Sequence, residues 1–204
     1  RQKGMETILP GNTASLDLFW NQNLRSQEKG RMFEERNSAL YYKFVGSDVD
    51  HLSESKDEQE TISLGLKWIG YKNQFFSSAL IPDGKFNGAL IRSGMNNDPA
   101  YLKNFHTETT VDYNPADNNG PGFRFYLGPN LYPLLHSYDK GVDDDKALDL
   151  DKLVPLGFKF FRWINTWIII PIFTFLGKYI ANYGIIILLM TIIIKIFLAP
   201  LTFK

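Results

Sequence analysis

The sequence predicts a mainly β protein that ends in an apolar, helical segment. Aromatic residues are dense in residues 1–128, and glycine, proline and asparagine interrupt them at short intervals, as in sheets of short strands. Residues 63–71 alternate apolar with small or polar side chains, which is the period of a half-buried strand. No Asp or Glu follows Asp151, whereas long apolar runs begin soon after it. These observations favour a β-sandwich or barrel-like pair of sheets, followed by membrane-associated helices.

The charge distribution separates the same two parts. Residues 1–157 hold all 22 acidic residues and 17 of the 22 basic ones, so they carry a net charge of −5, and residues 158–204 carry +5. The front part is long enough for one domain with its own core. The chain has no cysteine, which suits an oxidising envelope compartment. It starts with Arg1 and ends at Lys204 directly after an apolar segment, so we expect a piece of a longer protein.

Six strands are expected in the front part. Pro82, Asp83 and Gly84 form a turn sequence, because proline fixes φ and glycine permits a positive φ, and we expect the two flanking strands to pair as a hairpin. The charged residues 47–61 and the Asn/Gly/Pro-rich residues 114–122 are expected to be loops. The expected strands are 39–45, 63–71, 74–81, 86–91, 104–113 and 123–127.

The pattern changes to a helical one after Gly128. Leu131, Leu134, Leu135 and Tyr138 fall on one face of a short helix in residues 129–138, which would close a sandwich domain of residues 1–138. Residues 139–157 read as an acidic linker, in which Asp149 or Asp151 is placed to cap the next helix.

Residues 158–181 are expected to form an amphipathic helix that lies in the membrane interface. Lys159 and Arg162 are three residues apart and so share a helix face, and Trp163 and Trp167 lie beside them. Basic and aromatic side chains together favour the headgroup level of a bilayer. The charge-free run 163–176 is short for a span, although a tilted or re-entrant span stays an alternative.

Residues 182–204 are the best candidate for a transmembrane helix. The segment is apolar except for Thr191 and Lys195, and Pro200 is placed to end it. Lys195 lies about 16 Å along the helix from Gly184, roughly half of a hydrocarbon core. One interpretation is that its ammonium group reaches up to the headgroups. The other is that it faces a polar cavity, which the position of Thr191 one turn earlier on the same face favours.

The sequence of residues 182–202 resembles that of the YidC-type membrane protein insertases of the Oxa/Alb superfamily. The shared pattern is an aromatic-Gly start, an Ile/Leu run, Thr191, three apolar residues, a basic residue, four residues and then Pro-Leu-Thr. Residues 68–82 and 126–129 are also similar to the family's periplasmic domain. The resemblance implies a periplasmic β-supersandwich like that of galactose mutarotases, an interfacial helix and a transmembrane helix in the bacterial inner membrane.

The resemblance also implies a function without covalent chemistry. In the family, a basic residue in a hydrophilic groove attracts the polar part of an incoming protein and eases its passage into the membrane. Lys195 takes the place of the usual Arg, and Thr191 falls on a groove-lining position. The implied partners are nascent membrane proteins, the lipid bilayer, the secretion channel with its accessory subunits and, through parts absent here, the ribosome.

Other site types receive little support from the residues. His51, His106 and His136 do not have metal-ligand spacing, and the chain has no nucleophile elbow, cysteine or phosphate-binding glycine loop. We therefore expect no catalytic site, metal, cofactor or nucleic-acid partner. The acidic run 143–145 is more typical of a solvated linker than of a calcium site. The alternative function is a carbohydrate-binding or carbohydrate-modifying envelope domain with a plain membrane anchor.

Overall fold

The computed structural model describes residue 9 and residues 13–114, 120–157 and 163–202, with the side chains of 197, 198 and 200–202 not described. The chain divides into two compact units, Arg1–Val154 and Pro155–Lys204. Unit 1 contains nine described strands and three short helices, and unit 2 is helical. The predicted mainly β fold with helices after it is confirmed.

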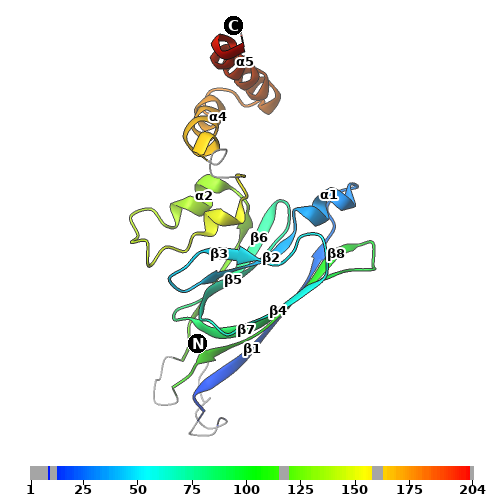
Figure 1. Ribbon diagram of the computed structural model, residues 1–204, viewed down its shortest axis with the longest axis vertical. Helices are drawn as coiled ribbons and strands as arrows, with labels where there is room; N and C mark the ends of the chain where they lie inside the picture. Colours follow the sequence, from blue (N-terminus) through cyan, green and yellow to red (C-terminus); the bar gives the residue numbers. More distant parts are fainter. Residues whose placement is uncertain (1–8, 10–12, 115–119, 158–162, 203–204) are drawn as a thin grey trace. The chain divides into compact units, whose positions relative to one another are not determined.

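The strands of unit 1 form antiparallel ladders in two halves (Figure 1). One half has the order β1-β8-β7-β4 and the other β9-β6-β5-β2-β3, and the pair Leu66–Phe86 of β5 and β7 links them. The strands are β1 (Ser15–Arg25), β2 (Ala39–Phe44), β3 (Val49–His51), β4 (Glu58–Ile62), β5 (Leu66–Lys72), β6 (Phe76–Pro82), β7 (Phe86–Met95), β8 (Tyr101–Asp112) and β9 (Phe123–Pro129).

Alternation along β2 shows how the two faces of the second half are buried. Leu40 and Tyr42 point into the main core between the halves, where they join residues such as Ile91 and Phe105 of the first half. Ala39 and Tyr41 point the other way, into a second apolar cluster. A strand buried on both faces has few exposed positions, and the six residues of β2 are buried except for the half-buried Phe44.

Two short helices cover the outer face of that half. Leu135 of α2 (Tyr132–Ser137) and Leu150 and Leu153 of the 3₁₀ helix η2 (Leu150–Leu153) pack against Trp68. The Trp68 Nε1 donates a hydrogen bond to the Leu148 carbonyl oxygen at 2.6 Å. Much of the segment expected to be a linker therefore packs onto the sheet, because its few apolar side chains fill the cluster around the tryptophan.

Six expected strands are found as β2 and β5–β9, and three further strands were missed. The hairpin expected between β6 and β7 is wrong. Both strands pair with β5, at opposite ends of it, and β6 pairs along its full length with β9. The Asp83 N–H donates to the Gly122 carbonyl oxygen, so the turn after Pro82 is tied to the loop before β9 instead.

The loop expected at residues 47–61 is also wrong in part, because it contains β3 and most of β4. Both lie at the sides of their half-sheets, where charged side chains reach solvent without entering the core. The start of the helix that Asp149 or Asp151 was expected to cap lies at residues 158–162, outside the described residues. Asp149 stands at the N-cap of η2 in a left-handed conformation without a side-chain capping bond, and its carboxylate accepts from Lys43.

Unit 2 consists of a helix from Trp163 to Gly177 and the 20-residue helix α5 (Tyr183–Thr202). A π-helical turn, η3 (Asn165–Ile169), precedes α4 (Ile170–Gly177). The wider turn lies next to Pro171. In a regular α-helix, a proline ring clashes with the carbonyl group four residues earlier. The rings of Phe173 and Tyr183 stack with centroids 6.0 Å apart, and Ile186 is fully buried. The helices are thus held together by apolar contacts.

Residues 182–204 were expected to form a transmembrane helix. Within the described part of the chain, no helix is both long and apolar enough to cross a membrane. What the structure confirms at this position is a helix of 20 residues.

Candidate functional site

Lys195 is the only charged residue of α5, and its side chain is exposed. Its sequence neighbours Ile194 and Ile196 are exposed as well, so the cation stands in an apolar surface. Among the described residues it has no ion pair, and residues 152–204 contain no carboxylate side chain that would supply one. The ammonium group is therefore available to an acidic or polar ligand.

Thr191 lies one turn before Lys195 on the same face of α5, as the sequence predicted. Its Oγ1 donates a hydrogen bond to the Ile187 carbonyl oxygen at 2.8 Å. The bond uses the hydroxyl proton and leaves the oxygen lone pairs free, so Thr191 presents an acceptor beside the donor of Lys195. The two residues together form a small polar stripe on an apolar helix.

Two of the four expected anchor residues lie in the described part of unit 2. Trp163 and Trp167 are 55% and 71% exposed, which is unusual for such large apolar side chains. They are four residues apart and so lie close to one face of the helix that includes η3. Lys159 and Arg162 fall outside the described residues.

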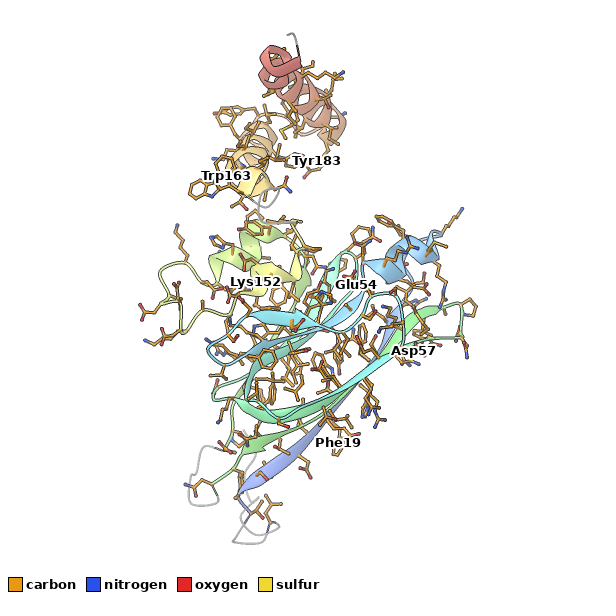
Figure 2. The ribbon with its side chains drawn as sticks, viewed as in Figure 1. Phe19, Glu54, Asp57, Lys152, Trp163 and Tyr183 are labelled. Carbon is orange, nitrogen blue, oxygen red and sulfur yellow. The ribbon has the colours of Figure 1, made fainter. Side chains whose placement is uncertain are left out.

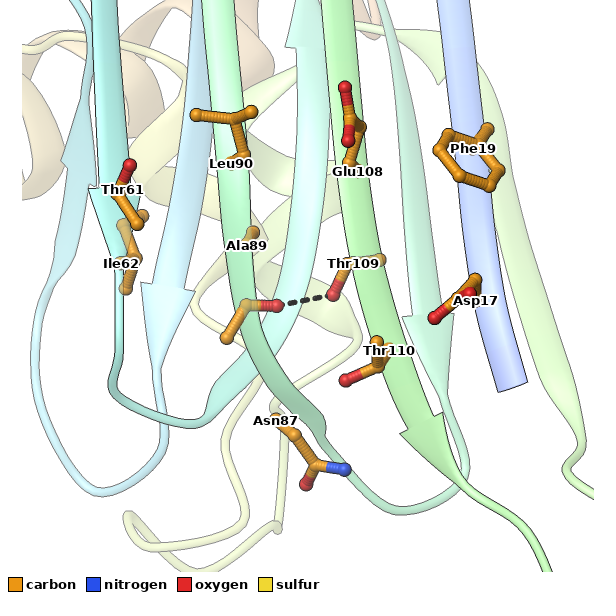
Figure 3. Close-up of a pocket in the computed structure, with 11 residues that line it drawn as sticks. Asp17, Phe19, Thr61, Ile62, Asn87, Ala89, Leu90, Glu108, Thr109 and Thr110 are labelled. Carbon is orange, nitrogen blue, oxygen red and sulfur yellow. Dashed lines mark hydrogen bonds between the residues drawn. The ribbon is translucent and has the colours of Figure 1, made fainter. Parts of the chain in front are cut away.

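Unit 1 carries an open hollow of about 410 Å³ on the solvent face of β1, β8, β7 and β4. Figure 3 shows side chains from these neighbouring strands around it, with Phe19 at one side and Thr61 at the other. Thr109 Oγ1 donates to the Gly88 carbonyl oxygen in its floor. Both polar and apolar residues line the hollow. Its two carboxylates belong to Asp17 of β1 and Glu108 of β8, which are adjacent strands.

The three carboxylates of Asp139, Asp149 and Asp151 approach one another closely enough to suggest a metal site. Their hydrogen bonds give them a different role. Asp139 accepts from the backbone N–H groups of Leu148 and Asp149, both at 2.6 Å, and Asp149 accepts from Lys43. Asp151 pairs with His136 at 3.2 Å. The bond from Lys43 ties the segment to β2, and the other bonds hold the segment together and join it to α2.

The histidines lie apart from one another. His51 Nδ1 contacts the Leu52 carbonyl oxygen, and His106 lies 2.7 Å from Glu108 on β8. Each of these two histidines is thus engaged by neighbouring groups of the chain.

Three buried lysines were not anticipated from the sequence. Lys43, Lys72 and Lys103 are almost completely buried, and each donates from Nζ to a backbone carbonyl oxygen. Lys103 donates to Ser38 at 2.7 Å and to Glu54 at 2.8 Å, and burial lowers the pKa of its ammonium group to about 8. The bonds tie separate segments together, which is a structural role.

Comparison with known proteins places these features in a family. The family model described as the YidC periplasmic domain matches residues 13–174. Proteins described as membrane protein insertase YidC are similar over nearly the whole chain: 50% identity in Parabacteroides distasonis, 46% in Azobacteroides pseudotrichonymphae and 40% in Porphyromonas gingivalis, covering 98%, 98% and 99% of this chain. The matches cover 32%, 33% and 32% of those relatives, so the chain spans about a third of their length. The carbohydrate-binding alternative receives no support from these matches.

Proposed function

Because the chain belongs to the family of YidC membrane protein insertases, we propose that it forms part of an insertase that helps hydrophobic proteins enter and fold in the bacterial inner membrane. The insertase activity of the relatives supports the proposal for the function. Lys195, exposed on apolar α5 and without an ion pair among the described residues, carries the proposal for the site. Unit 1 serves as a periplasmic scaffold.

In this function, Lys195 and Thr191 line a groove for the substrate, which parts of the protein outside this chain complete. A cation near apolar surroundings attracts a carboxylate more strongly than it does in water, because the effective dielectric is lower. Lysine supplies the charge without the planar donor fork of arginine, so the attraction has little geometric selectivity. Polar contacts along the groove lower the cost of moving a polar segment past apolar surroundings.

The anchor residues have a separate task in the proposal. Lys159, Arg162, Trp163 and Trp167 hold the preceding helix at the lipid headgroups, where basic and amphipathic aromatic side chains are favoured. The high exposure of both tryptophans supports this placement. The proposed partners are nascent membrane proteins, the secretion channel with its accessory subunits and, through other parts of the protein, the ribosome.

The test is an insertion assay with the full-length protein and substrates that differ only in the charge of the translocated tail. Lys195→Ala should lower the insertion of an acidic-tailed substrate roughly tenfold, equivalent to about 1.4 kcal/mol of lost attraction. Lys195→Arg should keep most of the activity, and the neutral-tailed substrate should be inserted normally. The adjacent substitution Ile194→Ala is the matched control. Equal insertion of the acidic-tailed substrate by Lys195→Ala and the unchanged protein would refute the role of the charge.

A further inference from the structure

One end of unit 1 exposes large apolar side chains on three separate segments. Met32 and Phe33 of α1 (Arg31–Arg36) are 67% and 63% exposed. Residues of the turn before β6 and of the start of α2 are exposed in the same way. We call this set the apolar end of unit 1; its members are Met32, Phe33, Phe75, Phe76, Leu131 and Leu134.

Hydrogen bonds place the three segments at the same end of the sandwich (Figures 1 and 2). Lys72 Nζ donates to the Asn37 carbonyl oxygen at 3.0 Å, which joins the residue after α1 to the end of β5. The Asn130 N–H donates to the Phe75 carbonyl oxygen at 2.7 Å, which joins the turn to the start of α2. The apolar end is therefore one region of the surface and not a scatter of single residues.

The segment that carries Met32 and Phe33 is held firmly in place. Glu34 of α1 is fully buried, and its carboxylate accepts from the backbone N–H groups of Gln27 and Glu28 at 2.8 Å and 3.2 Å. Arg31 Nη2 donates to the Asn96 carbonyl oxygen at 2.7 Å. The structure thus fixes this helix while its two largest apolar side chains face solvent, which indicates a surface that binds a partner.

Two exposed basic side chains, Lys29 and Arg36, lie on either side of the Met-Phe pair. Of the acidic residues nearby, Glu28 is exposed beside Lys29, Glu34 is buried, and Glu35 pairs with Arg31 at 2.6 Å. Protruding apolar side chains beside exposed cations are the combination that peripheral proteins use at the boundary between lipid headgroups and acyl chains.

We propose that the apolar end of unit 1 contacts the lipid surface of the membrane. The length of the connection supports a lipid occupant. Val154 ends unit 1, and Trp163 follows nine residues later, so even a fully extended connection spans at most about 30 Å. A helix anchored at the headgroups through Trp163 and Trp167 therefore keeps unit 1 within reach of the bilayer. The inference rests on the proposed function in this respect.

Single-cysteine labelling tests the contact directly, because this chain contains no cysteine and any cysteine elsewhere in the full-length protein is first replaced by serine. Phe33→Cys and Leu131→Cys would each carry an environment-sensitive fluorophore in the full-length protein, reconstituted into vesicles of phosphatidylethanolamine and phosphatidylglycerol. Lipids with a spin label high on the acyl chain act as quenchers. Leu64→Cys is the matched control, because Leu64 is 66% exposed in the turn between β4 and β5, at the opposite end of β5 from Lys72.

Emission at positions 33 and 131 should fall at least about twofold with the lipid quencher, while emission at position 64 stays unchanged. Phe33→Asp should reduce the quenching at position 131, because a carboxylate disfavours burial in the headgroup region. A label at Trp167→Cys separates the two hypotheses. Quenching at position 167 with none at 33 or 131 overturns the contact of unit 1 and leaves the anchor in place; no quenching at position 167 refutes the anchor itself. Formation of a protein cross-link at position 33 without lipid quenching also overturns the inference.

Discussion

Gly88→Ala should destabilise unit 1 strongly, because a Cβ atom has no room at this position. Gly88 has a φ of +148°, a conformation that side chains rarely adopt, and a Cβ would lie 2.6 Å from the Ile62 carbonyl oxygen. That oxygen belongs to β4, whose pairing with β7 begins at Ile62 and Ala89. The backbone strain costs about 1–3 kcal/mol, and displacement of β4 adds to it, so we expect a loss of roughly 2–4 kcal/mol.

Urea denaturation followed by circular dichroism measures this loss. With a slope of about 2 kcal/mol per molar urea, the midpoint should fall by about 1–2 M. Gly94→Ala in the same strand is the matched control, since no heavy atom lies within 4 Å of its added Cβ. It should leave the stability unchanged or raise it by a few tenths of a kcal/mol through the unfolded chain. Equal midpoints for the two variants would show that the close approach of β4 to Gly88 is not real.

Two further predictions concern buried side chains of unit 1. The pKa of Lys103 is about 8 in the folded protein and 10.5 in the unfolded chain. Between these pH values the unfolded chain binds more protons, so the free energy of unfolding should rise with pH, by at most roughly 3 kcal/mol. The difference in unfolding free energy between the unchanged protein and Lys103→Met should therefore shift in favour of the unchanged protein from pH 8 to 10; a constant difference would contradict the lowered pKa. Trp68→Phe removes the hydrogen bond to Leu148 and should lower the free energy of unfolding by about 2–4 kcal/mol. Trypsin should then cleave faster after Lys146 and Lys152. An unchanged cleavage rate would show that this hydrogen bond does not hold the segment.

Local patterns predicted the strands that lie in the core but not how they pair. The alternation of residues 63–68 located the central strand β5, but the strand is buried on both faces and not half-buried as expected, because it has partners on both sides and clusters on both faces. Strand β1 was missed because Asp17, Asn21 and Asn23 occupy its solvent face, so its sequence lacks the density of apolar residues seen in β5. The pairing of β6 with β9 joins residues more than 40 positions apart, and such a choice depends on packing across the whole sandwich.

For side chains too, features set by neighbouring residues in the sequence were predicted, and features set by distant residues were not. Lys195 and Thr191 were identified because their spacing and their apolar surroundings are local features of the sequence. The buried lysines were missed because nothing near Lys103 in the sequence indicates that Ser38 and Glu54 will offer carbonyl oxygens to it. Long-range acceptors of this kind become visible only when the strands are assembled.

The lysines of the two units differ in how their charge is compensated. In unit 1, Lys43, Lys72 and Lys103 are buried; Lys43 pairs with the carboxylate of Asp149, and Lys72 and Lys103 donate to backbone carbonyl oxygens of other segments. Lys195 is exposed on α5 and, among the residues described by the structure, forms no ion pair or hydrogen bond. Since no acidic side chain occurs after Asp151, a carboxylate partner for Lys195 must come from elsewhere in the protein or from a bound segment. In the function proposed above, an acidic stretch of an incoming protein would supply that partner, because its charge is opposite to that of Lys195.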